Sequence, residues 1–247
     1  MIIDSHIHWP VGEDSDPAAF LKMLDSYQID LALVSGWEVL FKLKTCSYWN
    51  NLLAEFCRKS SDRLYPLATV HLAQGKDALD EAQRCLDELA VKGFKVHPWM
   101  QAECVFCETM YGLCRLAAQC NVPLLFHDGT PPNALSSQIG VLANMFGDTT
   151  FILGHGGLLH YWQEAIEAAK QNNNIILTLC GQHPWAMQHI CDHIDNNRIV
   201  FGTDYLGPGT EELIPYRKGL VERLHLSEEQ RKKIMSENAV SIYRIST

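Results

Sequence analysis

Residues 1–8 read Met-Ile-Ile-Asp-Ser-His-Ile-His, an apolar start that predicts a β-strand. Side chains two positions apart on a strand lie on the same face, so we expect His6 and His8 to point in one direction, with Asp4 on the same parity. Pro10 then ends the strand. Two imidazoles that converge at a strand end form half of a divalent-metal site. The alternative is a pair of ordinary histidines near a chain terminus.

The rest of the chain repeats one pattern, in which a short apolar run is followed by a helical segment. Further strands are predicted at residues 31–34, 64–72, 93–97, 122–127, 150–153, 175–179 and 199–202. Strict alternation of this kind predicts parallel strands with right-handed crossovers. Eight such units predict an α/β fold that is a single (β/α)8 TIM barrel over residues 1–247, and an open doubly wound sheet is the alternative.

The composition argues against nucleic acid and membranes as binding partners. The formal net charge of -9 leaves no basic surface for nucleic acid and no polybasic segment for a membrane. No apolar run reaches the roughly 18 residues that span a bilayer, and we see no signal peptide. Nine scattered cysteines are typical of reduced thiols, so we expect a cytoplasmic protein. We expect its partner to be a small-molecule substrate, and we allow for a homodimer.

The carboxyl ends of the predicted strands carry many polar side chains. In TIM barrels the active site lies at this end of the strands. Taken singly, each of these residues is explained as a polar residue at a solvent-facing strand end. A closed barrel, however, brings all of them into one ring. The residues in question are His6, His8, His71, Lys95, His97, His127, Asp128, His155 and Asp204.

Such a ring suits a divalent metal, because neutral imidazole and carboxylate are common ligands of first-row metals in proteins. We expect zinc first and manganese second. A bound metal that keeps an open position lowers the pKa of water to about 7 and polarises a carbonyl group. Asp204 is a candidate to ligate this metal or to take a proton from its water. His155 is a candidate general acid or base, or a ligand of a second metal.

Six short motifs in the same order resemble a known family. They are D-S-H-I-H-W-P at the N-terminus, G-F-K-V-H-P, F-H-D-G-T-P-P, G-H-G-G, F-G-T-D-Y and the closing E-N-A. Together they resemble the amidohydrolase superfamily. Within it they look most like the amidohydrolase-related branch that includes aminocarboxymuconate semialdehyde decarboxylase and γ-resorcylate decarboxylase. The resemblance covers nearly the whole chain.

The resemblance implies roles for particular residues. The positions that ligate one metal match His6, His8, His127 and Asp204, and the catalytic histidine after the sixth strand matches His155. Binuclear members of the superfamily bridge two metals with a carboxylated lysine from the fourth strand. Lys95 is the candidate for that role here. The alternative is a lysine that forms a hydrogen bond inside the barrel.

The surroundings of the ring offer candidates for substrate binding. Tryptophans near strand ends suit a flat or partly apolar ligand, although such rings also pack loops onto barrels. They are Trp9, Trp37, Trp99 and Trp185. Few cationic side chains near the strand ends could bind a substrate carboxylate. Arginine suits this role better than lysine, because its guanidinium donates two parallel hydrogen bonds. The candidates are Arg217, Lys42 and Lys44, and His183 is a further residue for the barrel mouth.

Three functions follow from this pattern. The first expectation is metal-dependent hydrolysis, in which metal-activated water attacks a small-molecule amide, ester or lactone. The second is metal-dependent, non-oxidative decarboxylation of an unsaturated or aromatic carboxylic acid. The third belongs to another class, a barrel that binds a small ligand without catalysis. The complete ring of histidines and aspartate favours an enzyme over the third.

Overall fold

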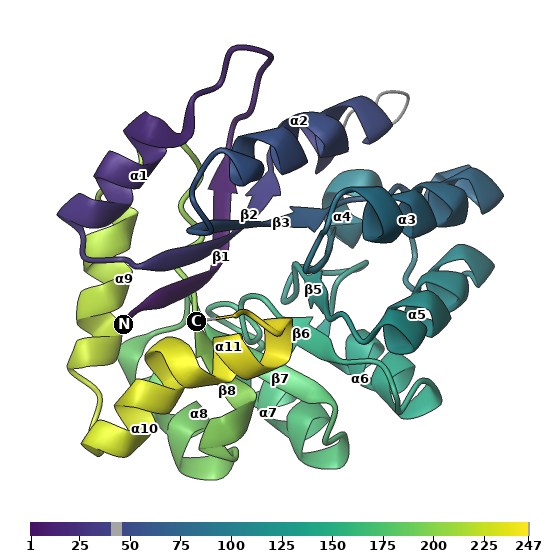
Figure 1. The fold of residues 1–247 in the computed structure, drawn as a ribbon. Coiled ribbons are helices and arrows are strands. Elements are labelled where there is room, and N and C mark those ends of the chain that lie inside the picture. Colours follow the sequence, from purple (N-terminus) through teal and green to yellow (C-terminus); the bar gives the residue numbers. More distant parts are fainter. Residues whose placement is uncertain (41–45, 247) are drawn as a thin grey trace.

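The computed structural model describes residues 1–40 and 46–246, and its eight parallel strands pair in chain order (Figure 1). The predicted (β/α)8 barrel is confirmed. The strands are β1 (Ile3–Trp9), β2 (Leu31–Gly36), β3 (Leu64–Ala68), β4 (Gly93–Val96), β5 (Leu124–Phe126), β6 (Phe151–Leu153), β7 (Ile175–Leu179) and β8 (Ile199–Phe201).

Helices connect successive strands and cover the outside of the barrel. None of the described helices is long and apolar enough to cross a membrane. The helices are α1 (Pro17–Ser26), α2 (Cys46–Arg58), α3 (Lys76–Glu88), α4 (Pro98–Gln101), α5 (Glu108–Cys120), α6 (Ser136–Met145), α7 (Trp162–Gln171), α8 (Pro184–His193), α9 (Leu213–Glu222), α10 (Glu228–Lys232) and α11 (Asn238–Tyr243). Two candidates for carboxylate binding, Lys42 and Lys44, lie outside the described residues.

The third strand is shorter than predicted, because it ends at Ala68 instead of residue 72. The side chain of Asn50 in α2 accepts a hydrogen bond from the Thr69 backbone N–H (3.1 Å) and donates one to the Thr69 carbonyl (3.0 Å). These backbone groups are the ones that a longer strand offers to its neighbours. The chain therefore leaves the sheet early, and His71 lies beyond the strand.

The barrel closes where the chain after β8 returns to β1. The backbone N–H of His8 donates to the carbonyl of Tyr205 (2.8 Å), and that of Asp204 donates to the carbonyl of His6 (2.7 Å). Asp204 adopts a positive φ of 50°, in the left-handed region that aspartate tolerates better than most residues. The closure therefore places the Asp204 side chain directly beside the two histidines of β1.

The side-chain parity of β1 changes along the strand. The register against β2 shifts between Asp4 and Ile7, which is a bulge of the strand. As a result His6 and His8 both face the barrel interior, as predicted, but Asp4 does not join them. Its carboxylate accepts hydrogen bonds from the Thr203 backbone N–H (3.0 Å) and hydroxyl (2.5 Å) and from the His6 N–H (3.1 Å).

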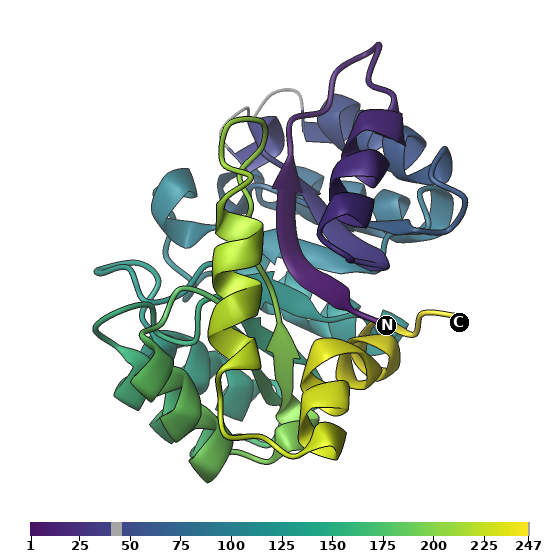
Figure 2. The same cartoon turned by 90° about the vertical axis from the view of Figure 1, so that its left-hand side faces the viewer.

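Apolar side chains fill the barrel below the polar ring. One buried cluster takes a residue from each of seven strands, and Tyr243 and Ile245 near the C-terminus pack against it. The strand residues are Ile3, Leu33, Leu67, Leu125, Ile152, Ile176 and Val200. Figure 2 shows the yellow helices α10 and α11 beside the N-terminus, at the end of the barrel where the strands begin.

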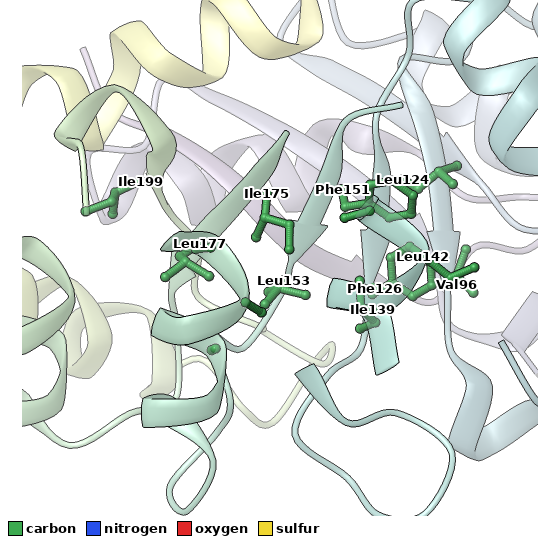
Figure 3. Packing of buried hydrophobic residues seen from close by; sticks show 14 of the residues in the cluster. Val96, Leu124, Phe126, Ile139, Leu142, Phe151, Leu153, Ile175, Leu177 and Ile199 are labelled. Atoms are coloured by element: carbon green, nitrogen blue, oxygen red, sulfur yellow. The ribbon is translucent and has the colours of Figure 1, made fainter. Parts of the chain in front are cut away.

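A larger apolar cluster lies between the strands and the outer helices. Figure 3 shows part of it, with buried side chains of β4–β8 and, next to Phe126 of β5, Ile139 and Leu142 of α6. Burial of each large apolar side chain contributes about 1.5 to 3 kcal/mol. These two layers hold the strands rigidly, and they leave the carboxyl ends of the strands as the place for polar groups.

We predict that Asp4→Ala lowers the free energy of unfolding by about 3 kcal/mol, because three buried donors lose an acceptor that joins β1 to the end of β8. Urea unfolding followed by circular dichroism measures the change. The control is Asp14→Ala, an exposed site where we expect a change within about 0.5 kcal/mol. Equal stabilities of the two variants would contradict the role given to Asp4.

Candidate active site

Seven of the predicted residues form one contiguous cluster at the carboxyl end of the barrel. Every member contacts at least one other through a hydrogen bond, an ion pair or a ring contact. The members are His6, His8, Lys95, His97, His127, His155 and Asp204. The ring predicted from the strand ends therefore exists in the fold.

His6, His8 and Asp204 converge within this cluster. The Nε2 atoms of His6 and His8 each lie 3.4 Å from Oδ1 of Asp204. The ligand atoms of all three residues lie within 4.8 Å of one another. Both histidines are buried, whereas the Asp204 side chain keeps 18% of its surface exposed at the barrel mouth. Two nitrogens and one oxygen thus surround a point that faces solvent on one side.

The far nitrogens of both histidines are held in place. Nδ1 of His6 donates to the carbonyl of Gly154 (2.9 Å), and Nδ1 of His8 lies 2.9 Å from the Ser35 hydroxyl. A Cβ on Gly154 would lie 2.6 Å from the Phe126 carbonyl, so glycine permits this close approach. In metal sites, ligating histidines usually hydrogen-bond through the second ring nitrogen in this way.

The charges also fit a metal. Burial lowers the pKa of His6 well below its ordinary value and lowers that of His8, so both imidazoles are neutral at pH 7. Burial alone raises the pKa of Asp204, but His155, His8 and Lys95 outweigh it and hold that pKa below its ordinary value. Two neutral imidazoles and one carboxylate fit a divalent first-row metal.

Lys95 projects from β4 into the same cluster. Its Nζ atom lies 2.7 Å from Nε2 of His6, and burial lowers the pKa of the ammonium group to about 8. The structure thus shows a lysine that forms a hydrogen bond inside the barrel, one of the two roles considered from the sequence. Carboxylation of Lys95 stays a prediction.

His155 and His127 form a chain of hydrogen bonds beside this centre. Nε2 of His155 lies 2.8 Å from Nδ1 of His127, whose Nε2 lies 2.8 Å from the Thr130 hydroxyl. Among the described residues, Nδ1 of His155 is buried and has no hydrogen-bond partner. The Asp128 carboxylate fixes the turn that carries His155, because it accepts from the backbone N–H groups of His155 (2.7 Å) and Gly157 (2.6 Å).

Of three further predicted residues, His97 contacts another member of the cluster, whereas His71 and Trp9 contact other parts of the fold. His97 stacks on His127 with ring centroids 3.9 Å apart, and burial lowers its pKa to about 2. His71 is turned away, with Nε2 2.6 Å from the Val39 carbonyl. Trp9 stacks on Phe20, in an apolar cluster with Tyr205.

The remaining aromatic candidates are more exposed. Trp99 and Trp185 are 54% and 56% exposed, and Trp99 lies 6.5 Å from the His97 ring. Trp37 contacts His8 edge-on at 5.3 Å. His183 stacks on Trp185. The aromatic rim predicted from the sequence is therefore divided between packing and exposed positions.

Arg217 of α9 reaches the same end of the barrel. Its Nη1 atom donates to the sulfur of Cys180 (2.7 Å). A Cβ on the intervening Gly181 would lie 3.4 Å from Arg217 Nη1 and 3.9 Å from His155 Nδ1, so the guanidinium and the imidazole flank one small residue. Arg217 Nη1 and His155 Nδ1 thus both lie near Gly181.

Sequence reasoning missed Cys180, which is buried and directly follows β7. The ligand atoms of Cys180, His6 and His155 also lie within 4.8 Å of one another. Its position could have identified it as a candidate, because it directly follows an apolar strand. His127 follows β5 in the same way. Thr130 and Ser35 were missed too, because only folding brings their hydroxyls to the histidines.

The fold and its convergent nitrogen and oxygen donors define a (β/α)8 barrel whose mouth suits a divalent metal. The sequence profile described as amidohydrolase matches residues 3–245. The chain therefore belongs to the amidohydrolase family. Among curated proteins, no sequence matches this chain.

Several solved structures share the fold. A 2,6-dihydroxybenzoate decarboxylase from Rhizobium has 18% identity and a TM-score of 0.75, with 98% of each chain covered. A 5-carboxyvanillate decarboxylase from Novosphingobium aromaticivorans, complexed with manganese and 4-hydroxy-3-methoxy-5-nitrobenzoic acid, has 15% identity and a TM-score of 0.78, covering 99% of this chain and 96% of that chain. A 4-oxalomesaconate hydratase from Rhodopseudomonas palustris has 18% identity and a TM-score of 0.78, with the same coverage.

We predict that His127→Ala weakens divalent-metal binding by at least about tenfold, since even residues that merely orient a metal ligand contribute that much. Isothermal titration with manganese or zinc measures the affinity. His225→Ala is the control, because His225 is an exposed histidine outside the cluster, and we expect this variant to keep the affinity unchanged. An unchanged affinity in His127→Ala would show that His127 supports His155 and does not ligate the metal.

Proposed function

We propose that this protein is a metal-dependent decarboxylase, which releases carbon dioxide without oxidation from an unsaturated or aromatic carboxylic acid. The observation that carries the proposal is the position of Arg217, whose guanidinium lies near Gly181 as His155 does. A guanidinium group is the side chain best suited to hold a carboxylate, because it donates two parallel hydrogen bonds. One hydrogen bond to Cys180 leaves most of its five N–H donors for a substrate.

Similarity to solved structures supports the same choice. Two of the compared structures are decarboxylases of aromatic acids, and one was complexed with manganese. The sequence placed hydrolysis first and decarboxylation second, and the comparisons favour the second expectation over the first. For the metal, they favour manganese at least as strongly as zinc.

In this proposal the metal is held by His6, His8 and Asp204, and His127 is the fourth ligand implied by the resemblance. A bound divalent metal supplies Lewis acidity, which stabilises negative charge on the carboxylate and on a neighbouring oxygen of the substrate. Ligation by His127 requires that one of its nitrogens give up its hydrogen bond to Thr130 or His155. The hydrogen bonds of Gly154 and Ser35 keep His6 and His8 in the ligating orientation.

In the proposed reaction, side chains of the protein supply the proton that replaces the lost carboxylate. Decarboxylation breaks a carbon–carbon bond, leaves its electron pair on the substrate carbon and requires one proton there. His155 Nδ1 has no hydrogen-bond partner among the described residues and lies near Gly181, as Arg217 does. In this proposal the proton passes from this Nδ1 atom to the carbon. Nε2 of His155 then draws a proton through His127. The Asp204 carboxylate is the alternative proton carrier.

We predict that the manganese-loaded protein releases carbon dioxide from at least one acid in a panel of aromatic and muconate-like acids. In D2O the product is expected to carry one deuterium at the carbon that lost the carboxylate, because a proton from the protein replaces it. Mass spectrometry measures both quantities. Turnover of a panel of lactones, esters and amides without any release of carbon dioxide would instead support hydrolysis.

We predict that Arg217→Ala lowers kcat/KM about tenfold to hundredfold, the loss expected for charge-assisted hydrogen bonds to a carboxylate. Arg217→Lys is expected to recover only part of this loss, because lysine lacks the planar fork. Arg223→Ala, at an exposed arginine that follows α9, is the matched control. An Arg217→Ala enzyme with normal kcat/KM would remove Arg217 from substrate binding.

A further inference from the structure

Cys180 lies among the candidate metal ligands, although none of the sequence motifs includes it. It is fully buried at the end of β7. Its sulfur and ligand nitrogens of His6 and His155 lie within 4.8 Å of one another. All three side chains are at least nine-tenths buried, so they form a second group of potential ligands next to His6, His8 and Asp204.

Two further observations support a role for this second group in metal binding. Nδ1 of His155 is buried and has no hydrogen-bond partner among residues 1–40 and 46–246. In the tautomer that carries its proton on Nε2, where His155 meets His127, this Nδ1 atom has a lone pair for a metal. Nη1 of Arg217 donates to the sulfur of Cys180 at 2.7 Å. Hydrogen bonds to a metal-bound sulfur are typical partners of thiolate ligands, because they stabilise its negative charge.

The two groups share His6, and this limits how many ions they hold together. Nδ1 of His6 donates to the Gly154 carbonyl, so only Nε2 has a lone pair for a metal, and Nε2 gives up its hydrogen bond with Lys95 when it binds one. An ion bound to His6 can therefore be coordinated further by one of two sets of residues. The first set, His8 and Asp204, offers nitrogen and oxygen. The second, Cys180 and His155, offers sulfur and nitrogen.

We propose that Cys180 is a metal ligand that makes the coordination of this site depend on the metal. Zinc or cobalt is bound by His6, His155 and Cys180, and manganese by His6, His8 and Asp204. The inference rests on the metal site of the proposed function. Its physical basis is that thiolate ligands favour zinc and similar metals, whereas carboxylate ligands suit manganese. On binding to sulfur, the metal replaces the thiol proton, which passes to the solvent.

The test begins with the protein loaded with Co²⁺, because a cobalt–thiolate bond gives a near-ultraviolet charge-transfer band. We expect the band in the wild-type protein and its loss in Cys180→Ser. Cys191→Ser is the matched control, since Cys191 is also buried but lies on α8, outside both ligand sets. That variant is expected to keep the band.

Affinities provide a second readout. In Cys180→Ser, zinc binding is expected to weaken by at least about tenfold, the smallest loss usual at metal sites, while manganese binding changes far less. If Cys180→Ser does not fold, zinc-edge X-ray absorption of the wild-type protein decides. It should show a sulfur neighbour of zinc at about 2.3 Å.

The outcomes separate this inference from the proposed function. Bound cobalt without a thiolate band, a band that persists in Cys180→Ser, or a zinc spectrum without sulfur overturns the role of Cys180. None of these affects manganese-dependent release of carbon dioxide, which is measured on the same preparations. A wild-type protein that binds neither cobalt nor manganese overturns both the Cys180 ligand and the metal site on which it rests.

Discussion

The site depends on the hydrogen bonds that join the chain after β8 to β1. The Asp204 N–H donates to the His6 carbonyl, and the His8 N–H donates to the Tyr205 carbonyl. These two bonds close the barrel and bring a carboxylate from one end of the chain against two imidazoles from the other. Asp4 reinforces the junction, because its carboxylate holds Thr203. Without the closure, the donors lie on separate edges of an open sheet.

Much of the fold and part of the site could be predicted from the sequence, because they depend on the spacing of apolar residues and on the order of strands and helices. Apolar runs that alternate with helical segments predicted the barrel. The positions of His6, His8 and Asp204 at strand ends predicted that these residues lie together. The rest depends on contacts that no local pattern records. The bulge of β1 removes Asp4 from the ring, and the Asn50 side chain ends β3 early. Likewise, only the folded chain brings Cys180 to His6.

The cluster divides into parts with different chemistry. On one side, neutral histidines and a carboxylate form the proposed site for a divalent metal. On the other, His155 and Arg217 flank Gly181 and offer a proton and a cationic fork. An acid whose carboxylate meets the fork and whose neighbouring oxygen meets the metal engages both parts at once. This division underlies the proposed decarboxylation, and Cys180 is the residue on which we propose that the choice of metal depends.

The most direct test of the central claim is a crystal structure of the manganese-loaded protein with anomalous diffraction recorded on both sides of the manganese absorption edge. The account predicts one strong anomalous peak within bonding distance of Nε2 of His6, Nε2 of His8 and a carboxylate oxygen of Asp204. No peak at the barrel mouth, or a peak that these three residues do not contact, would contradict it.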